Sequence, residues 1–252
     1  MNAALGLSMS SAIETLTGRV VVISPHLDDA VLSLGATIAG ASRNGATIIV
    51  LTVFAGDPAS RLPSGGWDRR AGFETWGHAS SGRREEDRHA CALLGATPIW
   101  LPYGDEQYER ARDEQEIGEA VHDVVKGADV VLLPGYPLSH SDHVWLTRIL
   151  LASRLPVQEV ALYVEQPYAF RVVLGLDPSP APLSWLTDAA GAELLWNRGA
   201  ASPRDWIAKW RAVRAYGSQM ALLGMRLNGE RRLRSMLWRD FRAGGEAIAP
   251  LP

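Results

Sequence analysis

The 252-residue sequence contains a single cysteine, Cys91. One thiol cannot form an internal disulfide, and it excludes the Cys-rich kind of zinc site, so a bound metal would need histidine and carboxylate ligands. Long hydrophobic runs are also missing, since no stretch of about 18 apolar residues is available to cross a bilayer. Residues 1–17 lack the basic start and apolar segment of a signal peptide and are expected to be a flexible leader. These absences predict a cytoplasmic protein with no membrane partner.

The chain also lacks a strong excess of either charge. Its formal net charge is -3 at pH 7, with 21% charged and 47% hydrophobic residues, which is ordinary for a folded globular protein. Nucleic-acid-binding proteins usually have a pronounced basic balance, so no nucleic-acid partner is expected. The length suits a single α/β domain with a sizeable core, which we place at residues 18–252.

Apolar segments alternate with helical segments along much of the chain. The run from Val20 to Ile23 is continuous and β-branched, as in strands buried on both faces of a parallel sheet. The expected strands are 20–23, 47–53, 98–101 and 130–133, and the expected helices between them are 30–41, 83–95 and 114–125. This alternation predicts a Rossmann-like, mostly parallel sheet flanked by helices. Ligands bind such sheets beyond the carboxyl ends of the strands.

Two segments stand outside this alternation. Residues 55–82 are rich in Gly, Pro and Ser but also contain Trp67, Phe73 and Trp76. Because aromatic content disfavours disorder, we expect an ordered loop of the lid type here. Arginines recur between residues 226 and 242, and such a run is most often a solvated face, so no function is assigned to it.

A histidine and two aspartates follow the first expected strand, in the sequence Pro-His-Leu-Asp-Asp. Zinc binds neutral imidazole nitrogens and carboxylate oxygens at about 2 Å, and a catalytic zinc keeps one position open for water. His26 and Asp29 can converge on one ion from a tight turn, which leaves Asp28 beside the metal as a candidate general base. The alternative is that both aspartates only cap the helix that follows.

A second polar cluster, His-Ser-Asp-His, follows the strand expected at 130–133. His143 is the natural third metal ligand, and His140 is a candidate to stabilise an oxyanion or to protonate a leaving amine. Asp142 is grouped with the catalytic residues because it can orient a neighbouring imidazole. A single histidine on a loop is more often structural, but two such clusters at the carboxyl ends of strands in one sheet favour a metal site. Zinc is the expected metal, and iron is compatible with these ligands.

The two motifs resemble the signatures of the PIG-L/LmbE family of zinc N-deacetylases. The resemblance implies that His26, Asp29 and His143 bind zinc, that Asp28 is the general base, and that His140 assists the tetrahedral intermediate. It also implies hydrolysis of the acetamide of an N-acetylated amino-sugar, with acetate and the free amine as products.

Weaker features extend the resemblance over most of the chain. The helix that begins near Arg83 and the short polar loop that ends at Asp105 resemble family segments, as do residues 163–168 and 216–219. By the resemblance, Arg83 and Asp105 contact sugar hydroxyls. The alternatives are that Arg83 pairs with Glu86 along the helix and that Asp105 caps a turn.

The substrate is expected to be a small-molecule glycoside or glycopeptide. The aromatic segment with Trp67 and Trp76 resembles the antibiotic-tailoring members of the family, and large aromatic side chains can support a bulky aromatic aglycone. The specific expectation is an N-acetylglucosaminyl glycopeptide precursor of the teicoplanin type. Two alternatives stay open: an amidase or deacetylase that acts on a low-molecular-weight thiol glycoside or conjugate, and a non-catalytic sugar-binding module.

Overall fold

The computed structural model describes residues 16–108, 113–175, 183–191, 193–199, 201–223 and 229–252. Within them, seven strands form one sheet in the order β3-β2-β1-β4-β5-β7-β6. The strands are β1 (Arg19–Ser24), β2 (Thr47–Thr52), β3 (Ala96–Trp100), β4 (Val130–Pro134), β5 (Glu159–Tyr163), β6 (Asn197–Gly199) and β7 (Glu246–Pro250). The first five strands run parallel to one another, and β7 and β6 close one edge in antiparallel pairs. The predicted mostly parallel α/β fold is therefore confirmed.

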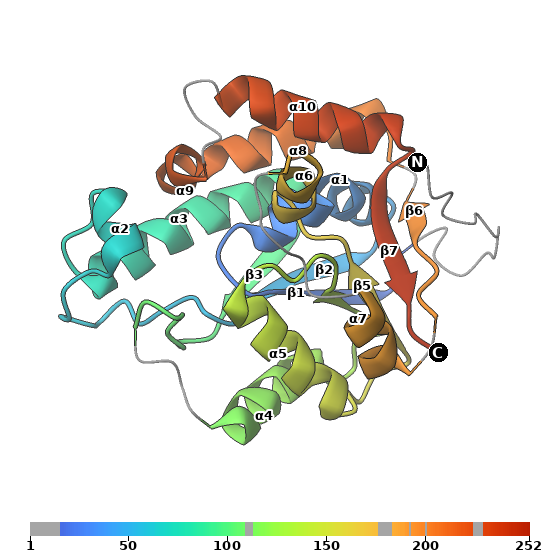
Figure 1. The fold of residues 1–252 in the computed structure, drawn as a ribbon, viewed down its shortest axis with the longest axis horizontal. Helices are drawn as coiled ribbons and strands as arrows, with labels where there is room; N and C mark the ends of the chain where they lie inside the picture. Colours follow the sequence, from blue (N-terminus) through green and yellow to red (C-terminus); the bar gives the residue numbers. More distant parts are fainter. Residues whose placement is uncertain (1–15, 109–112, 176–182, 192, 200, 224–228) are drawn as a thin grey trace.

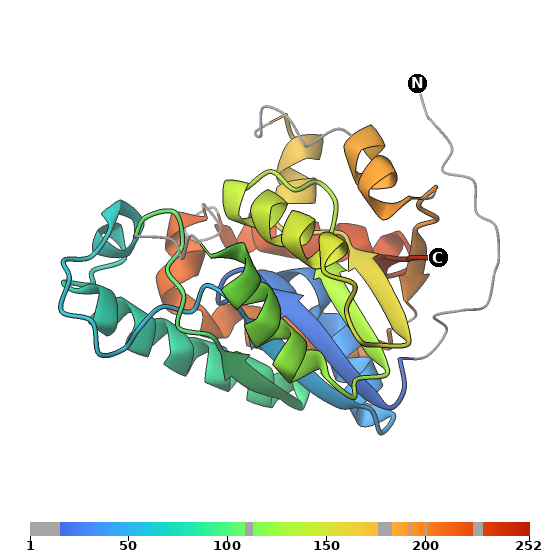
Figure 2. The same ribbon diagram turned by 90° about the horizontal axis from the view of Figure 1, so that it is seen from below.

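Helices cover both faces of this sheet (Figures 1 and 2). In the described residues they are α1 (Asp29–Arg43), α2 (Gly66–Arg70), α3 (Trp76–Leu94), α4 (Glu114–Val125), α5 (Ser141–Ala152), α6 (Tyr168–Val173), α7 (Leu183–Ala190), α8 (Pro203–Ala215), α9 (Gly217–Leu222) and α10 (Gly229–Arg242). One hydrophobic core joins the sheet to α1, α3, α8 and α10, and a second core joins the opposite face to α4, α5 and α7.

The central strand β1 supplies both cores. Val20 and Val22 pack into the core beneath α1, whereas Val21 and Ile23 pack into the core beneath α4 and α5. Successive side chains of a strand point to opposite faces, so a strand covered on both sides must be apolar at every position. This requirement explains the uninterrupted β-branched run in the sequence.

The segment expected to be a loop at residues 55–82 is partly helical, which corrects the prediction. It contains α2, and α3 begins at Trp76 rather than at Arg83, with the Thr75 hydroxyl accepting a hydrogen bond from the His78 amide at 3.1 Å. Glycine and serine in the first turns of α3 weaken the helical signal in the sequence. A Cβ on Gly77 would lie 2.4 Å from the carbonyl oxygen of Ser60, so the close approach of the preceding chain requires glycine there.

The leader expected at residues 1–17 lies outside the described residues except for Leu16 and Thr17, and Leu16 is buried in the core. Among the helices that the structure describes, none has both the length and the apolar character needed to cross a membrane.

Candidate metal centre

Two turns at the carboxyl ends of β1 and β4 carry the predicted metal ligands. His26 and Asp29 lie where β1 passes into α1, and His143 lies in the first turn of α5, directly after β4. Because β1 and β4 are neighbouring parallel strands, their carboxyl ends meet at the same edge of the sheet. The structure therefore brings together residues that are more than a hundred positions apart in the sequence.

Three donor atoms of these residues form a small triangle. The Asp29 Oδ2 atom lies 3.2 Å from His26 Nδ1 and 3.2 Å from His143 Nε2, and the two nitrogens are 3.1 Å apart. Zinc ligands at about 2.0–2.2 Å from a tetrahedral ion are about 3.3–3.6 Å from one another. The sides of the triangle are only slightly shorter, so small shifts of the side chains would let it hold one such ion.

The outer ring nitrogens of both histidines face buried carboxylates. His26 Nε2 lies 3.1 Å from Asp142 Oδ2, and His143 Nδ1 is bonded to Glu165 Oε1. A carboxylate at the outer nitrogen holds the ring proton there and directs the lone pair of the inner nitrogen toward the triangle. The two inner nitrogens face Asp29 Oδ2, which also accepts a hydrogen bond from the His26 backbone amide at 2.8 Å, and this buried set of two imidazoles and one carboxylate fits a divalent metal.

The electrostatic environment of His26 and His143 also fits a site for a cation. Burial opposes the charged form of His26, but hydrogen bonds with Asp142 and Asp29 outweigh it and raise its pKa to about 9. Burial also works against His143, yet the Asp29 and Glu165 carboxylates raise its pKa well above the usual value. Both shifts arise from buried carboxylates whose negative charge favours a positive partner at the triangle.

Asp28 occupies an unusual backbone position next to this site. Its φ of 156° is rarely adopted by a residue other than glycine, and its side chain makes no capping hydrogen bond to α1. The helix-capping alternative therefore fails for Asp28. Burial, followed by the neighbouring Asp29 carboxylate, raises the pKa of Asp28 to about 8, while Arg83 opposes that rise. Asp28 lines the cavity described below.

His140 caps α5 and faces the same cavity. Its Nδ1 accepts a hydrogen bond from the Asp142 amide at 3.2 Å, so the ring proton of the neutral form lies on Nε2. Burial, and then the nearby His26 and His143, lower the pKa of His140 to about 4. His140 can also join His26 and His143 in a group of three potential ligands. Asp29 is the better third ligand because its oxygen lies at 3.2 Å from both inner nitrogens.

Asp142 does not face the cavity, which corrects its grouping with the catalytic residues. It is fully buried, and its Oδ2 both contacts the outer nitrogen of His26 and accepts a hydrogen bond from the Glu106 amide at 3.1 Å. Asp142 is thus a positioning residue for His26. Glu165 has the same relation to His143 and was missed by the sequence analysis, although it follows the carboxyl end of β5 by only two residues.

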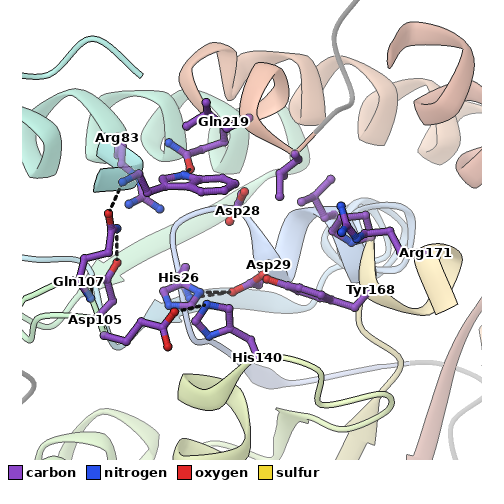
Figure 3. A pocket seen from close by; sticks show the side chains of 16 residues that line it. His26, Asp28, Asp29, Arg83, Asp105, Gln107, His140, Tyr168, Arg171 and Gln219 are labelled. Atoms are coloured by element: carbon purple, nitrogen blue, oxygen red, sulfur yellow. Dashed lines mark hydrogen bonds and ion pairs between the residues drawn. The ribbon is translucent and has the colours of Figure 1, made fainter. Parts of the chain in front are cut away.

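A cavity of about 340 Å³ opens over this centre. His26, Asp28, Asp29 and His140 lie on one side of it, and Arg83, Gln107 and Gln219 lie across from the two histidines (Figure 3). Tyr168 and Arg171 of α6 form a further wall (Figure 3). Gln107, Tyr168, Arg171 and Gln219 were not among the predicted site residues, although Tyr168 and Gln219 lie in the segments 163–168 and 216–219 that resemble family segments.

The two predicted sugar-binding residues both line the cavity. Arg83 is 7% exposed and pairs with Asp68 at 3.4 Å rather than with Glu86, whose carboxylate accepts hydrogen bonds from Ser218 instead. Among the described residues, the Nε of Arg83 has no hydrogen-bond partner. Asp105 accepts a hydrogen bond from the Gln107 amide at 2.9 Å, so it caps a turn and lines the cavity as well.

The two predicted aromatic contacts separate in the structure. Trp67 lines the cavity, where its Nε1 donates to Gln219 Oε1 at 2.8 Å. Trp76 does not line it, which corrects that prediction. Its ring stacks on Tyr108 with 4.6 Å between centroids and lines a much smaller cavity, which shares Arg83 and Asp105 with the main one. The reason is the early start of α3, which turns the Trp76 side chain toward the 105–108 loop.

Comparison with known proteins agrees with this architecture. The family described as PIG-L, GlcNAc-PI de-N-acetylase, matches residues 21–153. A 2'-N-acetylparomamine deacetylase of Streptomyces fradiae is 32% identical over an alignment of 172 residues, and the match covers 60% of this chain and only 58% of that relative's length. A crystal structure of a deacetylase in the biosynthesis pathway of teicoplanin has a TM-score of 0.74 at 25% identity, covering 92% of this chain and 97% of that one. The A40926 pseudoaglycone deacetylase has a TM-score of 0.75 at 26% identity, covering 93% and 96%.

Proposed function

Since the chain belongs to the PIG-L family, whose description is GlcNAc-PI de-N-acetylase, we propose that it is a metal-dependent N-deacetylase. The reaction is hydrolysis of the acetamide of an N-acetylglucosaminyl group, which gives acetate and the free amino-sugar. The observation that carries the proposal is the triangle of His26 Nδ1, Asp29 Oδ2 and His143 Nε2, whose sides are 3.1–3.2 Å. It stands at the base of a cavity large enough for a sugar.

The proposed metal is zinc, held by His26, Asp29 and His143. Mixed imidazole and carboxylate ligands suit zinc, and when bound the ion polarises the amide carbonyl and makes a water molecule more acidic. Asp142 and Glu165 keep the two imidazoles in the tautomer that binds metal.

The residues around the metal divide the proton transfers among them. Asp28 takes a proton from the attacking water, and the nearby positive charge of Arg83 favours the ionised form of Asp28 that this step needs. His140 is neutral and carries its proton on Nε2, so it can donate a hydrogen bond to the oxyanion formed at the amide carbon. Protonated Asp28 or His140 then delivers the proton to the departing amine.

The substrate that we propose is the N-acetylglucosaminyl group of an antibiotic precursor of the teicoplanin type. Arg83 and Asp105 offer charged partners for sugar hydroxyls, and the Trp67 indole offers a flat wall for an aromatic aglycone. The two similar crystal structures, whose names concern teicoplanin and the A40926 pseudoaglycone, support this class. An aminoglycoside precursor is the second candidate, which the 32% identical paromamine deacetylase favours.

One experiment tests the activity and the substrate together. Purified protein is incubated with N-acetylglucosaminyl glycopeptide precursors, N-acetylated aminoglycosides and an N-acetylglucosaminyl thiol conjugate, and free amine and acetate are both quantified. We expect equal amounts of the two products, loss of activity after treatment with a chelator, and recovery when zinc is added. Release of a larger acid in place of acetate would identify an amidase. Absence both of stoichiometric divalent metal and of hydrolysis would identify a non-catalytic sugar-binding module.

A further inference from the structure

The outer side of α10 combines arginines with exposed aromatic rings. Buried and exposed residues recur along α10 with helical spacing. Leu233, Met236 and Leu237 are buried against the core. The exposed residues between 231 and 242 are Arg231, Arg232, Arg234, Ser235, Trp238, Arg239, Phe241 and Arg242. Trp238 is 58% exposed and Phe241 is 39% exposed, which is unusual for rings of this size on the same surface.

Helix α8 continues this surface, and contacts between side chains join the two helices. Its exposed positions include Arg204, Ile207, Arg211 and Arg214, and Ile207 is 52% exposed. The Trp206 ring of α8 meets the Phe241 ring of α10 at 5.9 Å between centroids. Arg214 and Arg234 both lie over the ring of Trp210, at 5.5 and 5.4 Å. We call the exposed residues of 203–215 and 231–242 the α8–α10 face.

The charge of the α8–α10 face is opposite to that of the whole chain. Within residues 203–215 and 231–242 it exposes eight arginines and no acidic side chain. The two aspartates of these segments are buried, where Asp205 binds Arg43 and Asp240 accepts hydrogen bonds from Gln166. A formal net charge of -3 for the chain means that this positive charge is segregated onto one face.

Arginine mixed with exposed Trp, Phe and Ile matches the chemistry of a lipid headgroup region. Guanidinium groups bind phosphate, and indole and phenyl rings partition to the boundary between headgroups and acyl chains. The sequence analysis predicted no membrane partner because no segment can span a bilayer, but a surface can dock on a membrane without spanning it. We propose that the α8–α10 face docks the protein reversibly on membranes that contain acidic phospholipids. The phosphates of a nucleic acid could bind the arginines, and its bases could stack on the two rings, but it would bury little of the aliphatic side chain of Ile207. The boundary between headgroups and acyl chains can bind the arginines, the rings and the aliphatic side chain together.

Docking in this orientation brings the membrane close to the cavity wall. Helix α9 follows α8 directly and lies at one end of the α8 and α10 pair (Figure 1). Gln219 and Leu222 of α9, with Leu223 after it, line the cavity. The inference is independent of the proposed hydrolysis, because the face contains none of the residues of the metal centre.

Vesicle sedimentation at low ionic strength tests the proposal with the full chain. Vesicles of phosphatidylglycerol mixed with phosphatidylcholine are compared with vesicles of phosphatidylcholine alone. We expect binding to the acidic vesicles only, weakened by added salt. The double charge reversal Arg239→Glu with Arg242→Glu should reduce the affinity by more than about tenfold, since the loss of each basic residue near an acidic surface weakens binding about fivefold. Trp238→Ser should also reduce it, and should do so at high salt as well.

Matched substitutions elsewhere on the surface control for general effects. Arg61→Glu with Arg148→Glu changes the charge by the same amount, and Leu62→Ser removes a side chain that is 56% exposed. These controls should bind the acidic vesicles more tightly than the face variants do, while all variants keep their melting temperature. The proposal is wrong if the protein ignores acidic vesicles, if the controls lose as much affinity as the face variants, or if the face binds DNA or a second copy of the chain in place of vesicles.

Discussion

Glu165 is bonded to the outer ring nitrogen of His143, and neither side chain is more than 1% exposed. His143 follows β4 and Glu165 follows β5, and these two strands are parallel neighbours in the sheet. The carboxylate has one further hydrogen bond, from the Leu138 amide at 2.9 Å, which fixes its direction. The position of the imidazole is therefore set by the sheet and does not depend on a bound metal.

Replacing Glu165 by glutamine should weaken the metal site without dismantling it. The amide keeps the size of the side chain but no longer holds the ring proton of His143 with a negative charge. Loss of such a partner usually costs about 10–100-fold in metal affinity. Competition with a chromogenic chelator measures the change. Glu119→Gln, on the exposed surface of α4, is the matched control, and an equal loss in both variants would show that Glu165 has no special role.

Asp28→Asn should separate metal binding from turnover. The substitution removes the general base but none of the three proposed ligands, so metal content should stay stoichiometric while kcat falls by about two to four orders of magnitude. Metal analysis and steady-state kinetics on the same preparation give both numbers. His143→Ala provides the contrast, because it should lose most of its metal as well as its activity. Full turnover by Asp28→Asn would remove the base assignment.

The sequence predicted the site best where histidine and aspartate directly follow a predicted strand. The turns after β1 and β4 combine a strong strand pattern with histidine and aspartate, and the structure places His26, Asp29 and His143 together. Their roles in metal binding and catalysis stay predictions. A parallel sheet places the carboxyl ends of β1 and β4 at the same edge, as the sequence predicted, whereas only the structure shows that the two strands are neighbours.

What the sequence could not show depends on contacts between distant segments. Helix α3 was expected to start at Arg83 because glycine and serine at residues 77–82 hide its first turns, and those small residues are there for close packing. Gln219 enters the cavity only because α9 approaches α2, where it accepts the hydrogen bond of Trp67. Neither local sequence predicts the hydrogen bond between Gln219 and Trp67, because it depends on how α9 packs against α2.

The two tryptophans of the 55–82 segment should have different effects on the proposed reaction. Trp67→Ala removes a wall of the cavity and should raise KM several-fold for a bulky substrate, with kcat less affected. Trp76→Ala removes the stacking on Tyr108 outside the main cavity and should lower the melting temperature with little change in KM. Kinetics and thermal unfolding of both variants check the distinction. A larger rise in KM for Trp76→Ala would reverse the assignment.

Lys209 and Glu246 form a buried ion pair that joins α8 to β7, with 2.5 Å between Lys209 Nζ and Glu246 Oε1. Both are buried, so Lys209→Met leaves the Glu246 carboxylate in the core with hydrogen bonds from the Ala36 and Thr37 amides but without its positive partner. The expected loss is about 3–5 kcal/mol in the free energy of unfolding, measured by denaturant titration. The double variant Lys209→Met with Glu246→Gln should recover part of it, because the remaining side chain is then neutral. If the double variant were less stable than Lys209→Met, charge burial would not be the cause.

Asp205 should make stability depend on pH in the acid range. Burial disfavours its charge, but hydrogen bonds from Arg43 and Ser202 outweigh burial and lower its pKa. A carboxyl whose pKa is lower in the folded state stabilises the protein above its unfolded pKa of about 3.9, and this contribution is lost as pH falls through the folded value. Asp205→Asn should therefore cost about 1 kcal/mol at neutral pH, as for a lost helix cap.

The difference between wild type and Asp205→Asn should shrink as the pH falls from about 4 through the lowered pKa of the folded state, because the carboxyl takes up its proton first in the unfolded chain. Urea titrations of both proteins across this range measure it. Asp188→Asn, at an exposed position of α7, should show no comparable pH dependence. A difference that stayed constant down to about pH 3 would mean that the hydrogen-bond geometry of Asp205, and not its charge, stabilises the start of α8.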